Sequence, residues 1–363
     1  MNFKLYNVFN NELETEWIKI QGVNNVFVFQ TFNWNKIWCD NFLDNGIPFI
    51  YIIYEDDRPI ALFPFYFKTF FGVRTLFLIG GKQSDYLSPL FSDEIFDQNL
   101  KIDSIWEYLN KIIVGFHYLC FDKVPRTLSL NQLNPIVNLN GFSVTNISYS
   151  ANLPQSFEEY NSTLRSKLRS DIKRQVRRLE ELGELSFCYE IDQFSFEKYL
   201  NVLFELKSMQ YKRTGVIDAF ANDKVKKFYT SLFYNKFSSF KAVFSVLKLN
   251  DQPIAIHLGI QFSGRFYYLL PAYNFDYQVY SPGKILLHRI IQEAVNTKNV
   301  VFDFTVGGEE YKREWCNNEL VLQRFEYYRG ILGYIVKIVF SCVNFLKRDR
   351  YMRKILTSIK RIN

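Results

Sequence analysis

Apolar residues along this chain recur with two spacings, one typical of helices and one typical of strands. Between residues 102 and 114, for example, Ile102, Ile105 and Leu109 fall on one face of a helix. Similar spacing predicts helices over residues 32–43, 102–114, 162–182, 196–212, 223–237 and 282–297. Short apolar runs bounded by turn residues predict strands over residues 48–54, 59–68, 74–80, 117–121, 240–249, 253–262, 266–273 and 300–304.

The same order of elements occurs twice. The sequence Asp-Arg-Pro-Ile-Ala at 57–61 joins two predicted strands, and Asp-Gln-Pro-Ile-Ala occupies the matching place at 251–255. Because strands and helices alternate within both copies, we expect an α/β fold made of two related units. The predicted domains are residues 1–150 and 151–330, followed by a tail over residues 331–363.

One helix start in the second copy is predicted to bind phosphate. Tyr280 is followed by Ser281, a good helix N-cap, and by Pro282, which suits the first helical position. Gly283 costs about 1 kcal/mol relative to Ala in a helix. Lys284 is unfavourable by about 0.3–1 kcal/mol at the positive end of the helix dipole. Both residues suit an anion bound at the free N–H groups, and the alternative is an ordinary turn with a solvated lysine.

The net charge of +7 is concentrated in two segments. Residues 165–178 and 347–361 each carry seven cations and one Asp, so the rest of the chain is net negative. This distribution argues against a general nucleic-acid binder and favours local contact with phosphates, an acidic substrate or a membrane surface. On the predicted helix 162–182, Arg165 and Arg169 belong to a cationic row that we expect to contact substrate. A solvated amphipathic helix is the alternative.

Cysteine and histidine usage argues against disulfides and zinc. The five cysteines are widely spaced, and the three histidines form no cluster with them, so we expect reduced thiols, no metal and a cytoplasmic chain. No apolar signal core is found at the N-terminus. The apolar tract 331–346 is shorter than the ~20 residues that span a bilayer. The tail therefore either contacts an anionic membrane peripherally, on its inner face, or packs on the body.

Several of these segments together resemble a known family. The resemblance lies in residues 164–169 and 174–179, in Gln-Pro-Ile-Ala at 252–255, in residues 280–286, and in the Asp-Phe…Gly-Gly-Glu-x-Tyr-Lys block at 303–312. The chain resembles GNAT acyltransferases, in particular the acetyltransferases grouped with cellulose-biosynthesis CelD/BcsL-type proteins, which are similar to FemAB peptidyl transferases. The resemblance covers most of residues 30–330. It implies tandem GNAT domains, each with a mixed twisted sheet flanked by helices.

The resemblance also implies a site. Acyl-CoA, most simply acetyl-CoA, would bind its diphosphate at 280–284, and Tyr311 would protonate the leaving thiolate. The general-base candidates are Asp303, Glu310 and His257, although Asp303 could instead be a structural acid and His257 a buried, satisfied histidine. Lys312 would hold a phosphate or the substrate carbonyl, or pair with a neighbouring glutamate. By family analogy, Asp85 and Tyr86 face the acceptor.

The expected activity is transfer of an acyl group to an amine or hydroxyl of a sugar, amino sugar or lipid-linked envelope precursor. One alternative is a FemAB-like transferase that takes aminoacyl-tRNA, with the basic helix 165–178 contacting RNA. Another alternative is a non-catalytic scaffold held at a membrane surface by the tail.

Overall fold

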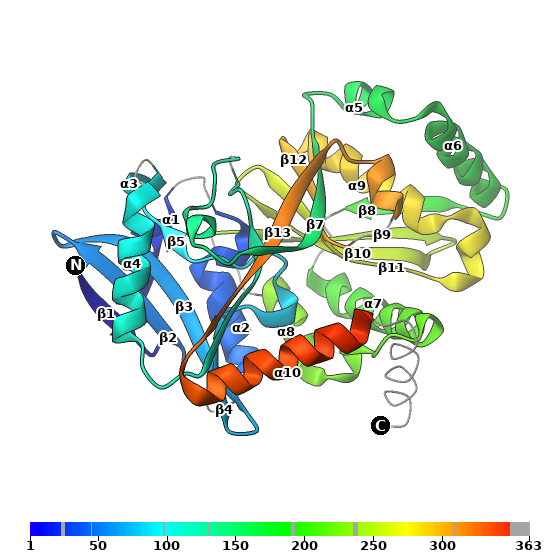
Figure 1. Cartoon of the computed structure of the whole chain (residues 1–363). Helices are drawn as coiled ribbons and strands as arrows, with labels where there is room; N and C mark the ends of the chain where they lie inside the picture. Colours follow the sequence, from blue (N-terminus) through cyan, green and yellow to red (C-terminus); the bar gives the residue numbers. More distant parts are fainter. Residues whose placement is uncertain are drawn as a thin grey trace.

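The computed structural model describes residues 1–22, 26–44, 46–96, 99–129, 131–189, 193–234, 239–307 and 310–348. Within them, thirteen strands form one continuous mixed sheet flanked by helices (Figure 1). The strand order is β1-β2-β3-β4-β6-β13-β7-β12-β11-β10-β9-β8, and β5 pairs with β3 at the side. The expected α/β class and the tandem arrangement are both confirmed.

The N-terminal half contributes one end of the sheet. Its strands are β1 (Asn2–Tyr6), β2 (Phe49–Glu55), β3 (Arg58–Phe70), β4 (Val73–Leu78), β5 (Leu90–Phe91), β6 (Tyr118–Pro125) and β7 (Ser143–Asn152). Its helices are α1 (Asn11–Gln21), α2 (Phe32–Phe42), α3 (Asp93–Phe96) and α4 (Asn99–Ile112). Helices α1 and α2 pack on one face of the sheet, in a core that includes residues 50 and 52 of β2. Helix α4 packs on the other face, in a core that includes residues 51 and 53, because successive side chains of a strand point to opposite faces.

The C-terminal half repeats this arrangement. Its strands are β8 (Leu185–Tyr189), β9 (Lys241–Leu249), β10 (Gln252–Phe262), β11 (Arg265–Tyr273), β12 (Val301–Val306) and β13 (Asn318–Tyr328). Its helices are α5 (Phe157–Thr163), α6 (Ser166–Glu180), α7 (Gln193–Thr214), α8 (Asp223–Tyr234), α9 (Pro282–Asn296) and α10 (Gly330–Arg348). Helix α9 covers one face of this half of the sheet, and α7 lies against the other (Figure 1).

The two halves exchange a strand. Strand β13 follows the C-terminal half in sequence but pairs antiparallel with β6 of the N-terminal half. Strand β7 follows the N-terminal half but pairs with β12 of the C-terminal half, and β7 and β13 also pair with each other. Each half therefore completes its sheet with a strand from the other part of the chain.

In each half, two parallel strands pair briefly and then separate. Strands β11 and β12 are in register over Arg265 to Tyr267 against Val301 to Asp303, after which β11 continues to Tyr273. Strands β4 and β6 pair over an equally short stretch in the N-terminal half. No ladder bonds connect the ends of β11 and β12 beyond this stretch.

The hydrophobic spacing located most central elements within a few residues. Helix 282–297 is confirmed as α9, with Pro282 at its first position. Ser281 is the N-cap, but it has φ 52° and ψ 50° and its side chain makes no capping hydrogen bond, so the expectation of side-chain capping was wrong. The predicted helix 162–182 is two helices, because Leu164 lies in an extended conformation between α5 and α6. The predicted helix 223–237 ends in α8 at Tyr234, and its last residues lie outside the described ones.

The predicted boundaries of the two domains and the tail can be tested by dividing the chain. Because β7 and β13 are exchanged, we expect neither 1–150 nor 151–363 to unfold cooperatively when expressed alone, and we expect the two fragments to recover a folded complex when mixed. Circular dichroism during urea titration measures both. A cooperative transition for isolated 1–150 would contradict this expectation.

Candidate active site

The start of α9 lies beside α6 and forms a basic pocket. We call this pocket of about 510 Å³ the α9 pocket; it extends from α6 to the 3₁₀ helix Glu310–Glu314. Its charged lining consists of Arg165, Lys167, Asp171, Arg174, Lys284 and Glu314. Cations outnumber acids among these side chains, and the free N–H end of a helix lies next to them, so the pocket suits a phosphate-bearing ligand.

Lys284 is held in place by an acid of α6. Its Nζ donates to Asp171 Oδ2 at 3.1 Å, and Arg174 Nη2 donates to Asp171 Oδ1 at 2.6 Å. The hydrogen bond from Arg174, together with that from Lys284, lowers the pKa of Asp171. The unfavourable cation at the helix start is therefore partly balanced within the protein, and an incoming phosphate would find both cations already positioned.

The first turn of α9 also offers a backbone donor. Pro282 has no N–H, and the N–H of Lys284 donates to the carbonyl of Ser281 at 3.0 Å, which leaves Gly283 as the N–H donor of the first turn. A Cβ at Gly283 would reach the Tyr273 ring at 3.4 Å, so the helix start sits close to the end of β11. Tyr280 is covered by Arg178, whose guanidinium carbon lies 4.7 Å from the ring centroid.

On the other face of the sheet, Asp303 joins the two halves. Its side chain is 1% exposed and accepts from Tyr86 Oη at 2.6 Å and from Arg265 Nη1 at 3.0 Å. It also accepts from the N–H of Thr305 at 2.8 Å, where β12 bulges and Thr305 has φ 58°. Tyr86 also contacts Ser148 of β7. Because of these contacts, we infer that Asp303 holds the two halves of the chain in place. Its expected role as a general base stays a prediction.

Asp85 and Lys312 lie next to this network. The carboxylate of Asp85 is partly exposed and lies 4.0 Å from Lys123 Nζ. Burial raises the pKa of Asp85, and the positive charges of Lys123 and Lys312 oppose this rise. Lys312 is 4% exposed and donates to the Val306 carbonyl at 3.3 Å. We call Asp85, Tyr86, Asp303, Thr305 and Lys312 the junction cluster.

One short helix links the α9 pocket to the junction cluster. In the 3₁₀ helix Glu310–Glu314, Glu314 lines the α9 pocket and Lys312 is the buried residue that acts on Asp85. Tyr311, next to Lys312, is 39% exposed. Burial raises the pKa of Tyr268 on the α9 face of the sheet, and Tyr311 adds to this rise. Glu310 is exposed at the start of this helix. The roles of Tyr311 and Glu310 stay predictions.

His257 lies away from this group. It is fully buried on the α9 face and stacks flat on Tyr268, with ring centroids 4.3 Å apart. Neither ring nitrogen has a hydrogen-bond partner among the described residues. Burial, with a smaller effect of the Lys207 charge, keeps the pKa of His257 well below its usual value. Asp303 points to the opposite face with Tyr267, so the structure does not bring these two candidate bases together.

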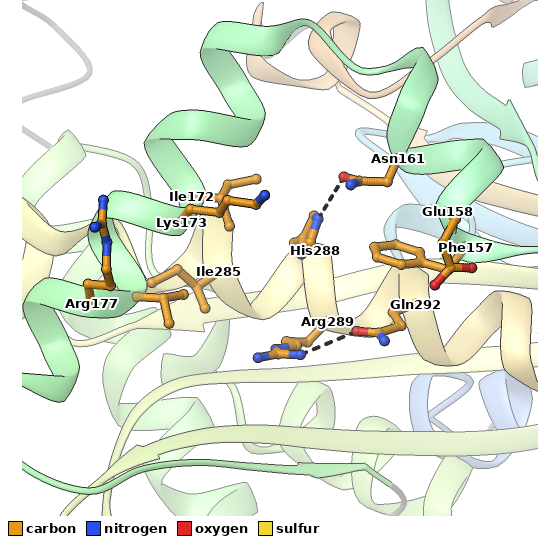
Figure 2. A pocket seen from close by; sticks show the side chains of 11 residues that line it. Phe157, Glu158, Asn161, Ile172, Lys173, Arg177, Ile285, His288, Arg289 and Gln292 are labelled. Carbon is orange, nitrogen blue, oxygen red and sulfur yellow. Dashed lines mark hydrogen bonds between the residues drawn. The ribbon is translucent and has the colours of Figure 1, made fainter.

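The residues of the predicted cationic row lie in different surroundings along α6. Arg165 lines the α9 pocket, whereas Lys173 and Arg177 line another pocket, of about 680 Å³, between α5, α6 and α9 (Figure 2). In this pocket, burial and the charge of Arg289 lower the pKa of His288 to about 4. Arg169 is part-buried and lines neither pocket. The predicted substrate contacts of Arg165 and Arg169 stay predictions.

Sequence reasoning found Asp85, Tyr86, Asp303 and Lys312, which the structure places together, but it missed other members of the site. It did not single out Arg265, Lys123, Thr305 or Ser148. Arg265 stands at the start of a strand and Lys123 inside one, where a charged residue suggests a buried partner. Among the described residues, no group of acids, histidines and cysteines is arranged to hold a metal.

Comparison with known proteins supports the fold. Residues 166–313 match the family model for the acetyltransferase (GNAT) domain. This segment resembles a GNAT domain. No curated protein matches the sequence.

Solved structures resemble nearly the whole chain. FemX has a TM-score of 0.65 at 11% identity, over 93% of this chain and 99% of that chain. The C-terminal domain of a putative lysylphosphatidylglycerol synthetase from Agrobacterium fabrum has a TM-score of 0.52 at 10% identity, over 91% and 95%. A tandem GNAT protein from the clavulanic acid biosynthesis pathway has a TM-score of 0.51 at 9% identity, over 91% and 99%. These likenesses show the fold, while the resemblance to CelD/BcsL-type proteins stays a prediction.

The junction network predicts a strong dependence on Arg265. Arg265→Met leaves the Asp303 carboxylate buried without its cation, which we expect to cost about 3–5 kcal/mol of unfolding free energy. Combining it with Asp303→Asn removes the charge but keeps an acceptor for Tyr86, so the double variant should be more stable than the Arg265 variant. Urea denaturation measures both. If the losses of unfolding free energy simply added up in the double variant, this result would contradict the pairing of Arg265 with the Asp303 charge.

Proposed function

We propose that the chain transfers an acyl group from acyl-CoA, in the first place acetyl-CoA, to an amine or hydroxyl at the junction cluster. The observation that supports this most is the short helix Glu310–Glu314, which connects a basic pocket at a helix start to a partly buried carboxylate and lysine. GNAT domains typically use acyl-CoA, and the matched family model covers α6, α9 and this short helix as far as Arg313.

In this proposal the donor crosses the sheet. The diphosphate would bind at the α9 pocket, with Lys284, Arg174 and the Gly283 N–H as donors of hydrogen bonds. The pantetheine arm would pass between the separating ends of β11 and β12. The thioester would then lie between Tyr311 and the junction cluster, where the acceptor can approach it.

The proposed acyl transfer needs one residue that accepts a proton and another that donates one. The acceptor nitrogen or oxygen attacks the thioester carbonyl, its proton passes to Asp85, and the carbon–sulfur bond breaks. Tyr311 would protonate the leaving thiolate, and Lys312 would stabilise the developing oxyanion. Asp85 suits the base role better than Asp303 because it is partly exposed and has a raised pKa. Asp303 is already engaged by Arg265 and Tyr86.

The acceptor we propose is a sugar, amino sugar or lipid-linked envelope precursor, and the chain would work on the cytoplasmic side of the membrane. A second candidate donor is aminoacyl-tRNA. Lys167, Lys173 and Arg177 are exposed at α6, where an RNA backbone can contact them, and the fold resembles that of FemX. Protection by acetyl-CoA in thermal unfolding, without retention of tRNA at physiological salt, favours acyl-CoA; the reverse result favours the tRNA donor.

Loss of Lys284 tests the donor site. We expect Lys284→Ala to weaken CoA binding by about 10- to 100-fold, because a hydrogen bond between charged groups contributes roughly 1.5–3 kcal/mol. Isothermal titration calorimetry gives the affinity. Lys227→Ala is the matched control, since Lys227 is exposed on α8 on the far face of the sheet. Equal affinities of the two variants would contradict the assignment of the α9 pocket.

The raised pKa of Asp85 predicts the acid side of the rate profile. A base must be deprotonated, so kcat/KM should fall as the pH decreases through a pKa above the ordinary value of 3.8. Asp85→Asn should lower kcat by about 10²- to 10⁴-fold and remove this limb. Release of the CoA thiol, with whichever amino-sugar acceptor supports turnover, measures both. Retention of the wild-type profile in Asp85→Asn would exclude Asp85 as the base.

A further inference from the structure

Helix α10 presents an apolar stripe away from the body of the protein. Successive residues of an α-helix are 100° apart, so positions 331, 334, 335, 338 and 342 share one side. All of them are exposed; Ile331 is 82% exposed and Ile338 is 62% exposed. We call this the outer stripe: Ile331, Tyr334, Ile335, Ile338 and Cys342. A contiguous apolar surface of this kind indicates a binding face.

The opposite side of α10 holds the helix on the body. A Cβ at Gly333 would come within 2.4 Å of the His117 carbonyl, so only glycine permits this close approach. The Phe340 ring contacts the Tyr118 ring edge-on, with centroids 5.4 Å apart, and Lys337 lies 6.0 Å from the Tyr328 ring centroid. These contacts fix the rotation of the helix, and the exposed outer stripe therefore faces away from them.

We propose that the outer stripe of α10 docks on an anionic membrane surface. The sequence over residues 330–346 contains one cation and no acid, and residues 347–361 then carry seven cations and one Asp. An apolar face followed by a basic segment matches the two attractions that hold interfacial helices, burial in the acyl boundary and charge attraction to lipid headgroups. No helix among the described residues has the length and apolar character of a membrane span.

A second copy of the chain is a less suitable occupant. Pairing two outer stripes would bring two segments of charge +6 into one small assembly, where they repel each other, whereas anionic lipid neutralises them. The same helix also lines a pocket of about 510 Å³ in the N-terminal half through Val339 and Phe340. Docking of α10 would bring this pocket, which lies where β4 and β6 separate, close to the lipid headgroups.

Vesicle flotation of the full chain tests the proposal. Vesicles of phosphatidylcholine alone and vesicles that also contain phosphatidylglycerol separate apolar from charge-dependent binding. We expect the wild type to float with the anionic vesicles, and the triple variant Ile331→Glu, Ile335→Glu, Ile338→Glu to bind at least about tenfold more weakly. Ile18→Glu is the matched control, since Ile18 is 58% exposed on α1, and it should bind like the wild type.

Two further measurements make each outcome decisive. Thermal unfolding of the triple variant shows whether it is folded, and light scattering after size exclusion gives the oligomeric state. Absence of wild-type binding to anionic vesicles, or undiminished binding of the folded triple variant, overturns the proposal. A dimer that the triple variant dissociates, with no vesicle binding, assigns the stripe to a second copy instead. Acetyl-CoA binding by the triple variant should remain unchanged, so this test is independent of the proposed acyl transfer.

Discussion

The buried carboxylate of Asp303 is the interaction on which the arrangement of the two halves depends. A carboxylate that is removed from water needs a cation and hydrogen-bond donors, because its desolvation costs several kcal/mol. Arg265 supplies the cation from the neighbouring strand, and Tyr86 supplies a hydroxyl from the N-terminal half. Satisfying this one charge therefore fixes the loop that carries Asp85 against the end of β12, where the sheet bulges.

This constraint connects the two sides of the candidate site. The α9 pocket lies on one face of the sheet, and the junction cluster lies on the other, between the halves. Strands β11 and β12 separate just beyond Asp303. Under the proposed function, the donor crosses the sheet at this point, where the halves are joined. The exchange of β7 and β13 strengthens this coupling, since neither half has a complete sheet without the other.

The sequence predicted the local features of this fold better than its long-range ones. Pro282 at the start of α9 follows from proline geometry, and the repeated order of strands predicted two related units. Strand β7 was missed because Ser143–Asn152 is largely polar. In addition, β7 and β13 each pair with a strand more than 140 positions away in the sequence. Tyr86, Asp303 and Lys312 were selected by family resemblance, but Arg265 was not, because a buried ion pair leaves no periodic signal. The neutral, stacked environment of His257 is likewise a property of the packed core.

The account depends most directly on where a phosphorylated donor binds. A crystal structure of the chain with acetyl-CoA measures this. We expect the diphosphate within hydrogen-bond distance of Lys284 Nζ and the Gly283 N–H, with the thioester between β11 and β12 and facing Asp85. Acetyl-CoA bound elsewhere, for example between α5, α6 and α9, with the separation of β11 and β12 filled by protein side chains, would contradict the proposed acyl transfer.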